Sequence, residues 1–181
     1  RSLVTGNIIF RKRLEGIGII DAEMCRKYGA TGPVIRGAGV AYDIRKAEPY
    51  SAYPEFDFEI PTRPEGDSMA RYHVRMEEME QSLRIIEQAI GRLPDGPHIA
   101  TNVPRVLKPP AGDYCFAVEA ARGRFMVRIV SDAKEVAYRV KLRTPSFSNL
   151  SLFEEASRGM MLPDALALMG SLDLVIPDID R

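Results

Sequence analysis

Three carboxylates and a terminal arginine lie among aliphatic residues at the end of the chain. Asp173, Asp178 and Asp180 are interleaved with leucine, valine and isoleucine, and the chain stops at Arg181. Carboxyl groups set in an apolar wall can hold and transfer protons beside an apolar molecule. The guanidinium of Arg181 is able to hold Asp178 by a charge-assisted hydrogen bond. The segment therefore predicts either a proton-transfer site in a pocket or a buried tail pinned by salt bridges.

Arg36 is a second candidate because glycines lie on both sides of it. Gly32 and Gly37 let other backbone segments approach closely. A guanidinium, which is always charged, needs a carboxylate or carbonyl partner if it is buried there. The simpler hypothesis is a structural Arg–Asp clamp. The alternative is that Arg36 faces a functional cavity.

The cysteines and histidines do not form a metal or disulfide pattern. Cys25 and Cys115 are far apart and no C-x-x-C pair occurs, which is typical of a reducing compartment, so we expect packed thiols. His73 and His98 have no partner at ligand spacing. The 25 basic and 25 acidic residues cancel to a formal charge of zero, which disfavours nucleic-acid binding. We therefore predict neither a metal site nor a nucleic-acid partner.

Membrane and dinucleotide signals are also missing from the sequence. No apolar run approaches the roughly 20 residues that span a bilayer, and the first residues do not resemble a signal peptide. We expect any membrane association to go through partners. Gly16-x-Gly18 and Gly37-x-Gly39 lack the later glycine and the strand-then-helix context of a dinucleotide fingerprint.

A long amphipathic helix is predicted from Asp67 to about Arg92. Its apolar residues recur at spacings of three and four, and they are Met69, Tyr72, Met76, Met79, Leu83, Ile86 and Ile90. We expect this stripe to be core. Arg71, Arg75 and Glu78 share a face, which we expect to be a solvated or subunit-contacting ion network.

Shorter elements surround the long helix. The sequence predicts a helix over 21–27, an irregular segment over 31–64, a loop over 94–110, and antiparallel strands over 114–119, 124–131 and 138–143. Ser151 and Glu154 form a capping box for a helix that continues through Arg158. Pro163 suits the first turn of another helix, ending near Gly170, and a strand-like tail follows.

Four segments carry the patterns of one family. The end of the chain reads Gly-Ser-Leu-Asp at 170–173 and Asp-Arg at 180–181, and matching stretches occur at 32–46, 66–82 and 138–150. Together these segments resemble the hydrogenase-related subunit in the peripheral arm of respiratory complex I, the proton-pumping NADH:quinone oxidoreductase. The likeness spans essentially the whole chain. Pro177 and Asp178 depart from it, because the family usually has glycine and glutamate at these positions.

The same family is related to the large subunits of nickel–iron hydrogenases, which bind metal through cysteines near their C-terminus. Laying that pattern on 173–181 puts Val175 and Asp178 at two thiolate positions. Neither residue supplies the soft ligand that nickel needs. The resemblance implies a hydrogenase scaffold that has lost its metal and uses the vacated cavity for a quinone.

The resemblance implies an α+β fold, the C-terminal part of a hydrogenase large-subunit-like fold, with 1–181 as a single domain and a fragment of a longer subunit. It implies a part of the quinone-binding site that contributes to quinone reduction and its coupling to proton transfer. Asp173, Asp178 and Arg181 would be catalytic, while Val175 and Arg36 would line the quinone cavity. The family's direct hydrogen-bond donors to quinone belong to the other half of the subunit, so we expect the fragment alone to be inactive.

No cofactor is expected on this chain. Quinone would be the substrate, whereas NADH, FMN and the iron–sulfur clusters would belong to partner subunits. The implied partners are other peripheral-arm subunits of complex I, including the iron–sulfur subunit that faces the quinone cavity, at the cytoplasmic face of the cell membrane. Two alternatives stay open: a related quinone- or ferredoxin-linked membrane oxidoreductase, and a purely structural assembly subunit whose acidic tail is sealed by packed side chains.

Overall fold

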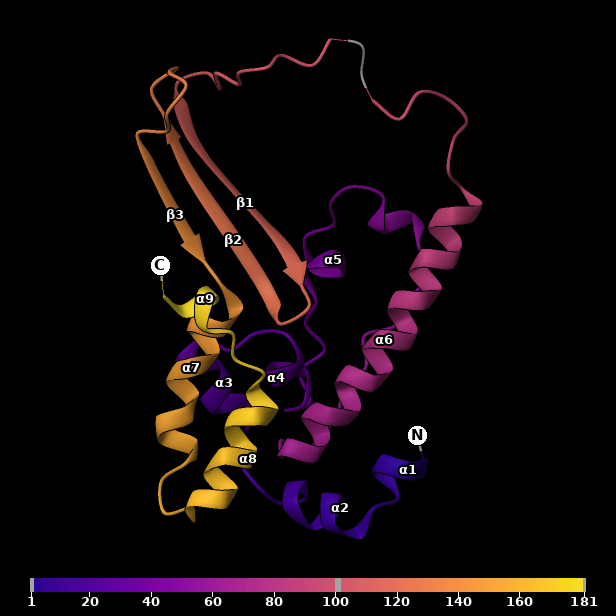
Figure 1. Ribbon diagram of the computed structural model, residues 1–181, viewed down its shortest axis with the longest axis vertical. Coiled ribbons are helices and arrows are strands. Elements are labelled where there is room, and N and C mark those ends of the chain that lie inside the picture. Colours follow the sequence, from indigo (N-terminus) through magenta and orange to yellow (C-terminus); the bar gives the residue numbers. More distant parts are fainter. Residues whose placement is uncertain (1, 100–101, 181) are drawn as a thin grey trace.

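Short helices, one long helix and one three-stranded sheet make up the computed structural model, which describes residues 2–99 and 102–180 (Figure 1). The helices before the sheet are α1 (Ser2–Thr5), α2 (Ile8–Leu14), α3 (Ala22–Tyr28), α4 (Pro33–Arg36), α5 (Ile44–Ala47), η1 (Tyr53–Glu55) and α6 (Ser68–Gly91). The sheet contains β1 (Gly112–Ala120), β2 (Gly123–Ser131) and β3 (Arg139–Arg143), and the last helices are α7 (Pro145–Ala156), α8 (Leu162–Leu172) and α9 (Ile176–Ile179). The predicted α+β class is confirmed.

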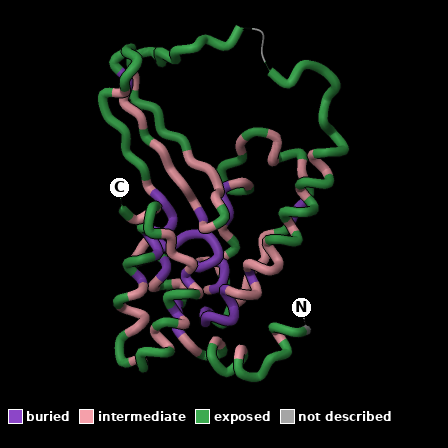
Figure 2. Tube along the Cα trace, in the orientation of Figure 1, coloured by how far each residue is buried: buried purple, intermediate pink, exposed green. Residues whose placement is uncertain are grey.

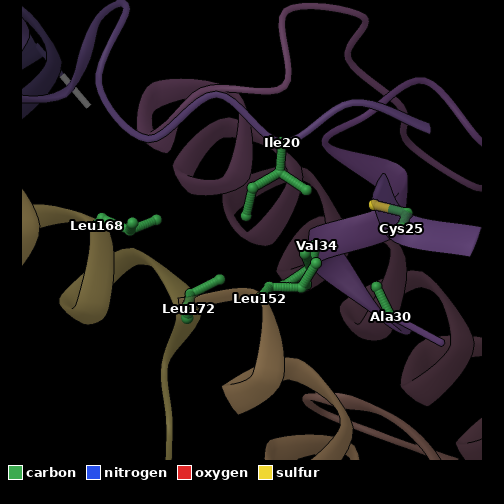
Figure 3. Packing of buried hydrophobic residues seen from close by; sticks show 7 residues of the cluster. All are labelled: Ile20, Cys25, Ala30, Val34, Leu152, Leu168 and Leu172. Atoms are coloured by element: carbon green, nitrogen blue, oxygen red, sulfur yellow. The ribbon is translucent and has the colours of Figure 1, made fainter. Parts of the chain in front are cut away.

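The hydrophobic core lies where α3, α4, α7 and α8 meet, below the sheet in Figure 2. Figure 3 shows its buried members, which are Ile20, Cys25, Ala30, Val34, Leu152, Leu168 and Leu172. They come from both ends of the sequence. Burial of their apolar surface therefore holds the first and last thirds of the chain together.

The long helix α6 begins where the sequence predicts it. Asp67 is the N-cap, and its carboxylate accepts a hydrogen bond of 2.7 Å from the backbone N–H of Ala70. The expected core stripe is correct only at the start of the helix, where its first residue, Met69, is buried. Beyond that, Met79 and Ile90 are 53% and 65% exposed, because the second half of α6 extends away from α8 (Figure 1).

The three strands form the predicted antiparallel meander in the order β1-β2-β3. The β1–β2 register runs from Gly112 opposite Ser131 to Ala120 opposite Gly123. The turn of this hairpin packs against the N-terminus of α4. There Thr31 Oγ1 accepts a hydrogen bond of 2.9 Å from the Arg124 N–H, so the hairpin is tied to the helical part of the molecule.

The C-terminal elements differ from the sequence prediction. Helix α7 begins at Pro145, and Ser151 lies inside it with its hydroxyl donating to the Ser148 carbonyl at 2.8 Å. The predicted capping box at Ser151 is therefore wrong, because proline at the first turn starts the helix earlier. The strand-like tail is also wrong. A helical turn, α9, forms there with Pro177 in its first turn.

Two kinds of feature are absent from the described residues. No helix there is both long and apolar enough to cross a bilayer. No group of three or more histidine, cysteine, aspartate and glutamate residues is placed there to hold a metal ion.

The two cysteines are in different surroundings, and only one fits the expectation of a packed thiol. Cys25 is buried in the core, where burial raises its pKa to about 11, whereas Cys115 is exposed on β1. Alkylation requires the thiolate. We expect iodoacetamide at about pH 8 to modify Cys115 while Cys25 stays unmodified until the chain unfolds. Peptide mass spectrometry over time measures both, and equal rates would contradict this assignment.

Candidate functional site

A cavity of about 480 Å³ opens between α2, α6 and α8. Its lining residues are Phe10, Leu14, Ser68, Tyr72, Arg75, Ala167, Gly170, Ser171 and Asp173. The rings of Phe10 and Tyr72 stand edge to face, with 5.0 Å between their centroids. The volume is within the usual range for small-molecule sites, and apolar walls with a few polar groups are their usual composition.

Asp173 lies at this cavity because of the way α8 ends. It is the C-cap of the helix, with φ 53° and ψ 51°, a left-handed conformation that reverses the chain. Arg122, in the β1–β2 turn, fixes it from the other side. Its Nε donates to the Asp173 carbonyl at 2.8 Å, and its Nη2 donates to the carboxylate at 3.1 Å. The carboxylate is thus held by the hairpin while remaining 42% exposed.

Arg75 is the cation in the cavity wall. Its Nη1 donates to the Ser171 carbonyl at 2.7 Å, while its buried Nε has no hydrogen-bond partner among the described residues. Burial lowers the pKa of Arg75, and the negative charge of Asp173 opposes that shift. The cavity therefore has a carboxylate and a guanidinium with an unused donor beside aromatic side chains.

Arg71 binds the end of α8, two residues before Asp173. It is fully buried, and it donates to Ser171 Oγ at 2.9 Å, to the Gly66 carbonyl at 2.8 Å and to the Gly18 carbonyl at 2.9 Å. Burial lowers its pKa to about 10. The predicted solvated ion network on this face of α6 is wrong for Arg71, because the end of α8 and the loop before α3 cover it.

Asp178 and Val175 lie away from the cavity at Asp173. The Asp178 carboxylate accepts a hydrogen bond of 3.0 Å from Ser146 Oγ. The Val175 N–H donates a hydrogen bond of 3.4 Å to Ser146 Oγ. Helix α9 thus packs against α7 (Figure 1), and neither residue lines the 480 Å³ cavity. Arg181 is outside the described residues, so its predicted contact with Asp178 stays a prediction.

Arg36 is buried, but away from this cavity. Its Nε donates to Glu78 in α6, and its Nη1 donates at 2.9 Å both to Glu119 in β1 and to the Tyr42 carbonyl. It lines a separate pocket of about 230 Å³. The predicted clamp to an aspartate is only partly correct, because Asp43 is 3.8 Å from Arg36 and the two glutamates are closer.

Sequence reasoning missed several residues of the cavity, including Phe10, Tyr72 and Arg75, and it also missed Arg122, which binds Asp173 from the hairpin turn. The spacing of Arg71, Arg75 and Glu78 had marked one face of α6, but nothing local shows that α8 ends against that face. Arg122 lies in the turn between β1 and β2, and its contact with Asp173 spans 51 residues. Of the predicted site residues that the structure describes, only Asp173 is brought to the cavity.

Known proteins of one family match this chain along its whole length. The family model described as respiratory-chain NADH dehydrogenase, 49 kDa subunit, matches residues 1–109 and 101–181. An NADH-quinone oxidoreductase subunit from Opitutus terrae is 72% identical over 100% of this chain and 45% of that protein. A subunit of the same name from Desulfotalea psychrophila is 65% identical over 100% of this chain and 49% of that protein. The chain spans about half the length of the curated relatives it matches.

Proposed function

Because the chain belongs to the family of the respiratory-chain NADH dehydrogenase 49 kDa subunit, we propose that the cavity beside Asp173 is part of the quinone-binding wall of an NADH:quinone oxidoreductase. Its relatives are named as subunits of NADH-quinone oxidoreductase. The observation that supports this role most directly is the placement of Asp173. Its carboxylate lies at the edge of an apolar cavity, next to the half-buried Arg75.

The cavity residues suit the chemistry of a quinone. Reduction to quinol adds two electrons and two protons, so the site must hold a flat apolar ring and supply protons to its oxygens. Phe10 and Tyr72 offer aromatic surface for the ring. Asp173 is placed to hold or transfer a proton, and the Arg75 guanidinium favours negative charge as it develops on a quinone oxygen.

The electrons would come from other chains. We place NADH, FMN and the iron–sulfur clusters in partner subunits of the peripheral arm, including an iron–sulfur subunit on the far side of the quinone cavity. Membrane association would go through those partners, on the cytoplasmic face of the cell membrane. Coupling of quinone reduction to proton movement would begin at Asp173. Asp178 has a positioning role, because its contact with Ser146 holds the chain segment that follows Asp173.

The test is Asp173→Asn in the full-length subunit, in membranes that contain the assembled complex. We expect quinone-dependent NADH oxidation to fall about tenfold or more, because proton transfer and charge balance are lost. Reduction of an artificial acceptor that bypasses the quinone should stay unchanged. Asp164→Asn is the matched control, since Asp164 is also in α8 but does not line the cavity. Normal quinone reduction by Asp173→Asn, with normal assembly, would rule out the proposed role.

A further inference from the structure

The strand β3 forms an open edge of the sheet. It pairs with β2 on one side, and no backbone hydrogen bond from elsewhere in the described part of the chain reaches its other side. The opposite edge is different near the end of β1, where α5 packs and the Tyr50 hydroxyl accepts a hydrogen bond of 3.0 Å from the Glu119 N–H. In Figure 1, β3 is the strand on the side away from α5 and α6. Its outer N–H and C=O groups are therefore available to another strand.

One face of β3 is strongly basic. Arg139 and Lys141 share this face, and Lys141 is directly opposite Arg128 in the β2–β3 register. The three cations and Val130 line a pocket of about 130 Å³. Arg128 has a counter-ion, because it donates to the Asp113 carboxylate at 2.8 Å. Within the part of the chain that the structure describes, the side chains of Arg139 and Lys141 have no ion pair or hydrogen bond, so their charges are not compensated.

The other face of the same strand is apolar. Val140 and Leu142 alternate with the cations, and they are 53% and 40% exposed. Together with Lys141, Phe147 and Ile179 they line a second pocket, of about 520 Å³. The edge of β3 therefore lies between a basic pocket on one face of the sheet and an apolar pocket on the other.

We infer that the outer edge of β3 binds an extended segment of a partner subunit, with alternating acidic and apolar side chains, as a fourth strand of the sheet. Backbone hydrogen bonds continue the sheet in this arrangement. Partner carboxylates neutralise Arg139 and Lys141, while partner apolar side chains cover Val140 and Leu142. This docking surface rests on the proposed assembly of the chain with other subunits, but not on any role of Asp173.

Other occupants match only part of this surface. A second copy of β3 would bring Arg139 and Lys141 close to the same cations of that copy, and like charges across neighbouring strands are destabilising. A free phosphate would neutralise the cations, but it would leave the backbone edge and the apolar pocket open. An extended acidic and apolar segment satisfies the cations, the backbone groups and the apolar side chains together.

Carbodiimide cross-linking of the assembled full-length complex tests this docking surface. The reagent joins a lysine to a carboxylate only when the two are in contact. We expect Lys141 to be joined to an aspartate or glutamate of another subunit, in a segment whose acidic and apolar residues alternate, and peptide mass spectrometry identifies the joined peptides. Lys108 and Glu135, whose charged atoms are 3.1 Å apart, are the internal control. If this control pair is joined while Lys141 stays free or is joined to a second copy of this chain, the inference is wrong.

Hydrogen exchange in the same complex distinguishes an added strand from a contact made by side chains alone. Only alternate N–H groups of an edge strand are bonded to its neighbour, so the others exchange quickly when no further strand is present. We expect all the amides of 139–143 to exchange at least about tenfold more slowly than those of the exposed connection at 132–135. Rapid exchange of half of the 139–143 amides would rule out the added strand.

Charge reversal provides a third measurement. We expect the double variant Arg139→Glu with Lys141→Glu to lower the amount of assembled complex at least about fivefold, because it repels an acidic partner. Lys12→Glu is the matched control, since Lys12 is exposed on α2 and has no ion pair with another described residue. Equal assembly of the two would contradict the inference. Asp173→Asn should leave the Lys141 cross-link in place, so failure of the proposed quinone role is distinguishable from failure of this surface.

Discussion

Gly32→Ala is expected to destabilise the chain by about 3 kcal/mol or more. An added Cβ would lie 2.2 Å from the Arg122 carbonyl oxygen and 2.7 Å from the Gly123 Cα. These are backbone atoms of the hairpin turn, so they cannot move aside as the end of a side chain would. Gly32 also has φ 68° and ψ −144°, a conformation that only glycine adopts without strain.

Urea unfolding followed by circular dichroism measures this effect. Gly159→Ala separates the two causes, because Gly159 has φ 76° but no atom within 4 Å of its added Cβ. We expect the control to cost only about 1 kcal/mol. Similar losses in both variants would show that backbone strain, and not the contact with the hairpin, limits position 32. Because the same turn contains Arg122, Gly32→Ala should also disturb the placement of Asp173.

The second large effect is expected for Arg71→Met, which should lower the free energy of unfolding by about 3–5 kcal/mol. Methionine fills much of the same space but leaves the Gly18 and Gly66 carbonyls and the Ser171 hydroxyl without the bonds that Arg71 donates. The Gly66 carbonyl keeps the hydrogen bond from the Ile20 N–H, so the cost is greatest at the Gly18 carbonyl, because an unpaired buried group costs about 1–3 kcal/mol. The loss is greatest at the end of α8, because the contact of Arg71 with Ser171 fixes the residue two positions before Asp173.

Arg84→Met is the matched control, since Arg84 is exposed on the same helix. We expect it to change stability by less than about 0.5 kcal/mol. Thermal unfolding reports the stability difference, and quinone-dependent activity of the full-length complex reports the position of Asp173. A stability of Arg71→Met equal to that of the control would show that water replaces the lost hydrogen bonds.

Local signals were sufficient for much of the fold. The long helix follows from an N-cap aspartate and a three-to-four spacing of apolar residues, which are properties of consecutive residues. The meander follows from three strand-like runs separated by a short Ala-Ala-Arg-Gly turn and a polar stretch at 132–135, and β1 and β2 pair as expected. The start of α7 was missed because two signals competed, and the proline at 145 outweighed the capping pattern at Ser151.

The sequence by itself determined the family, the α+β class and the presence of a carboxylate at position 173. Only the tertiary structure decided which groups meet. Arg36 and Glu119 are 83 residues apart, and Arg122 and Asp173 are 51 residues apart. Such pairings depend on how α6, α8 and the hairpin pack on one core, and that packing arises from many apolar contacts at once. The cavity and the glutamate partners of Arg36 therefore have no signature in any single segment of the chain.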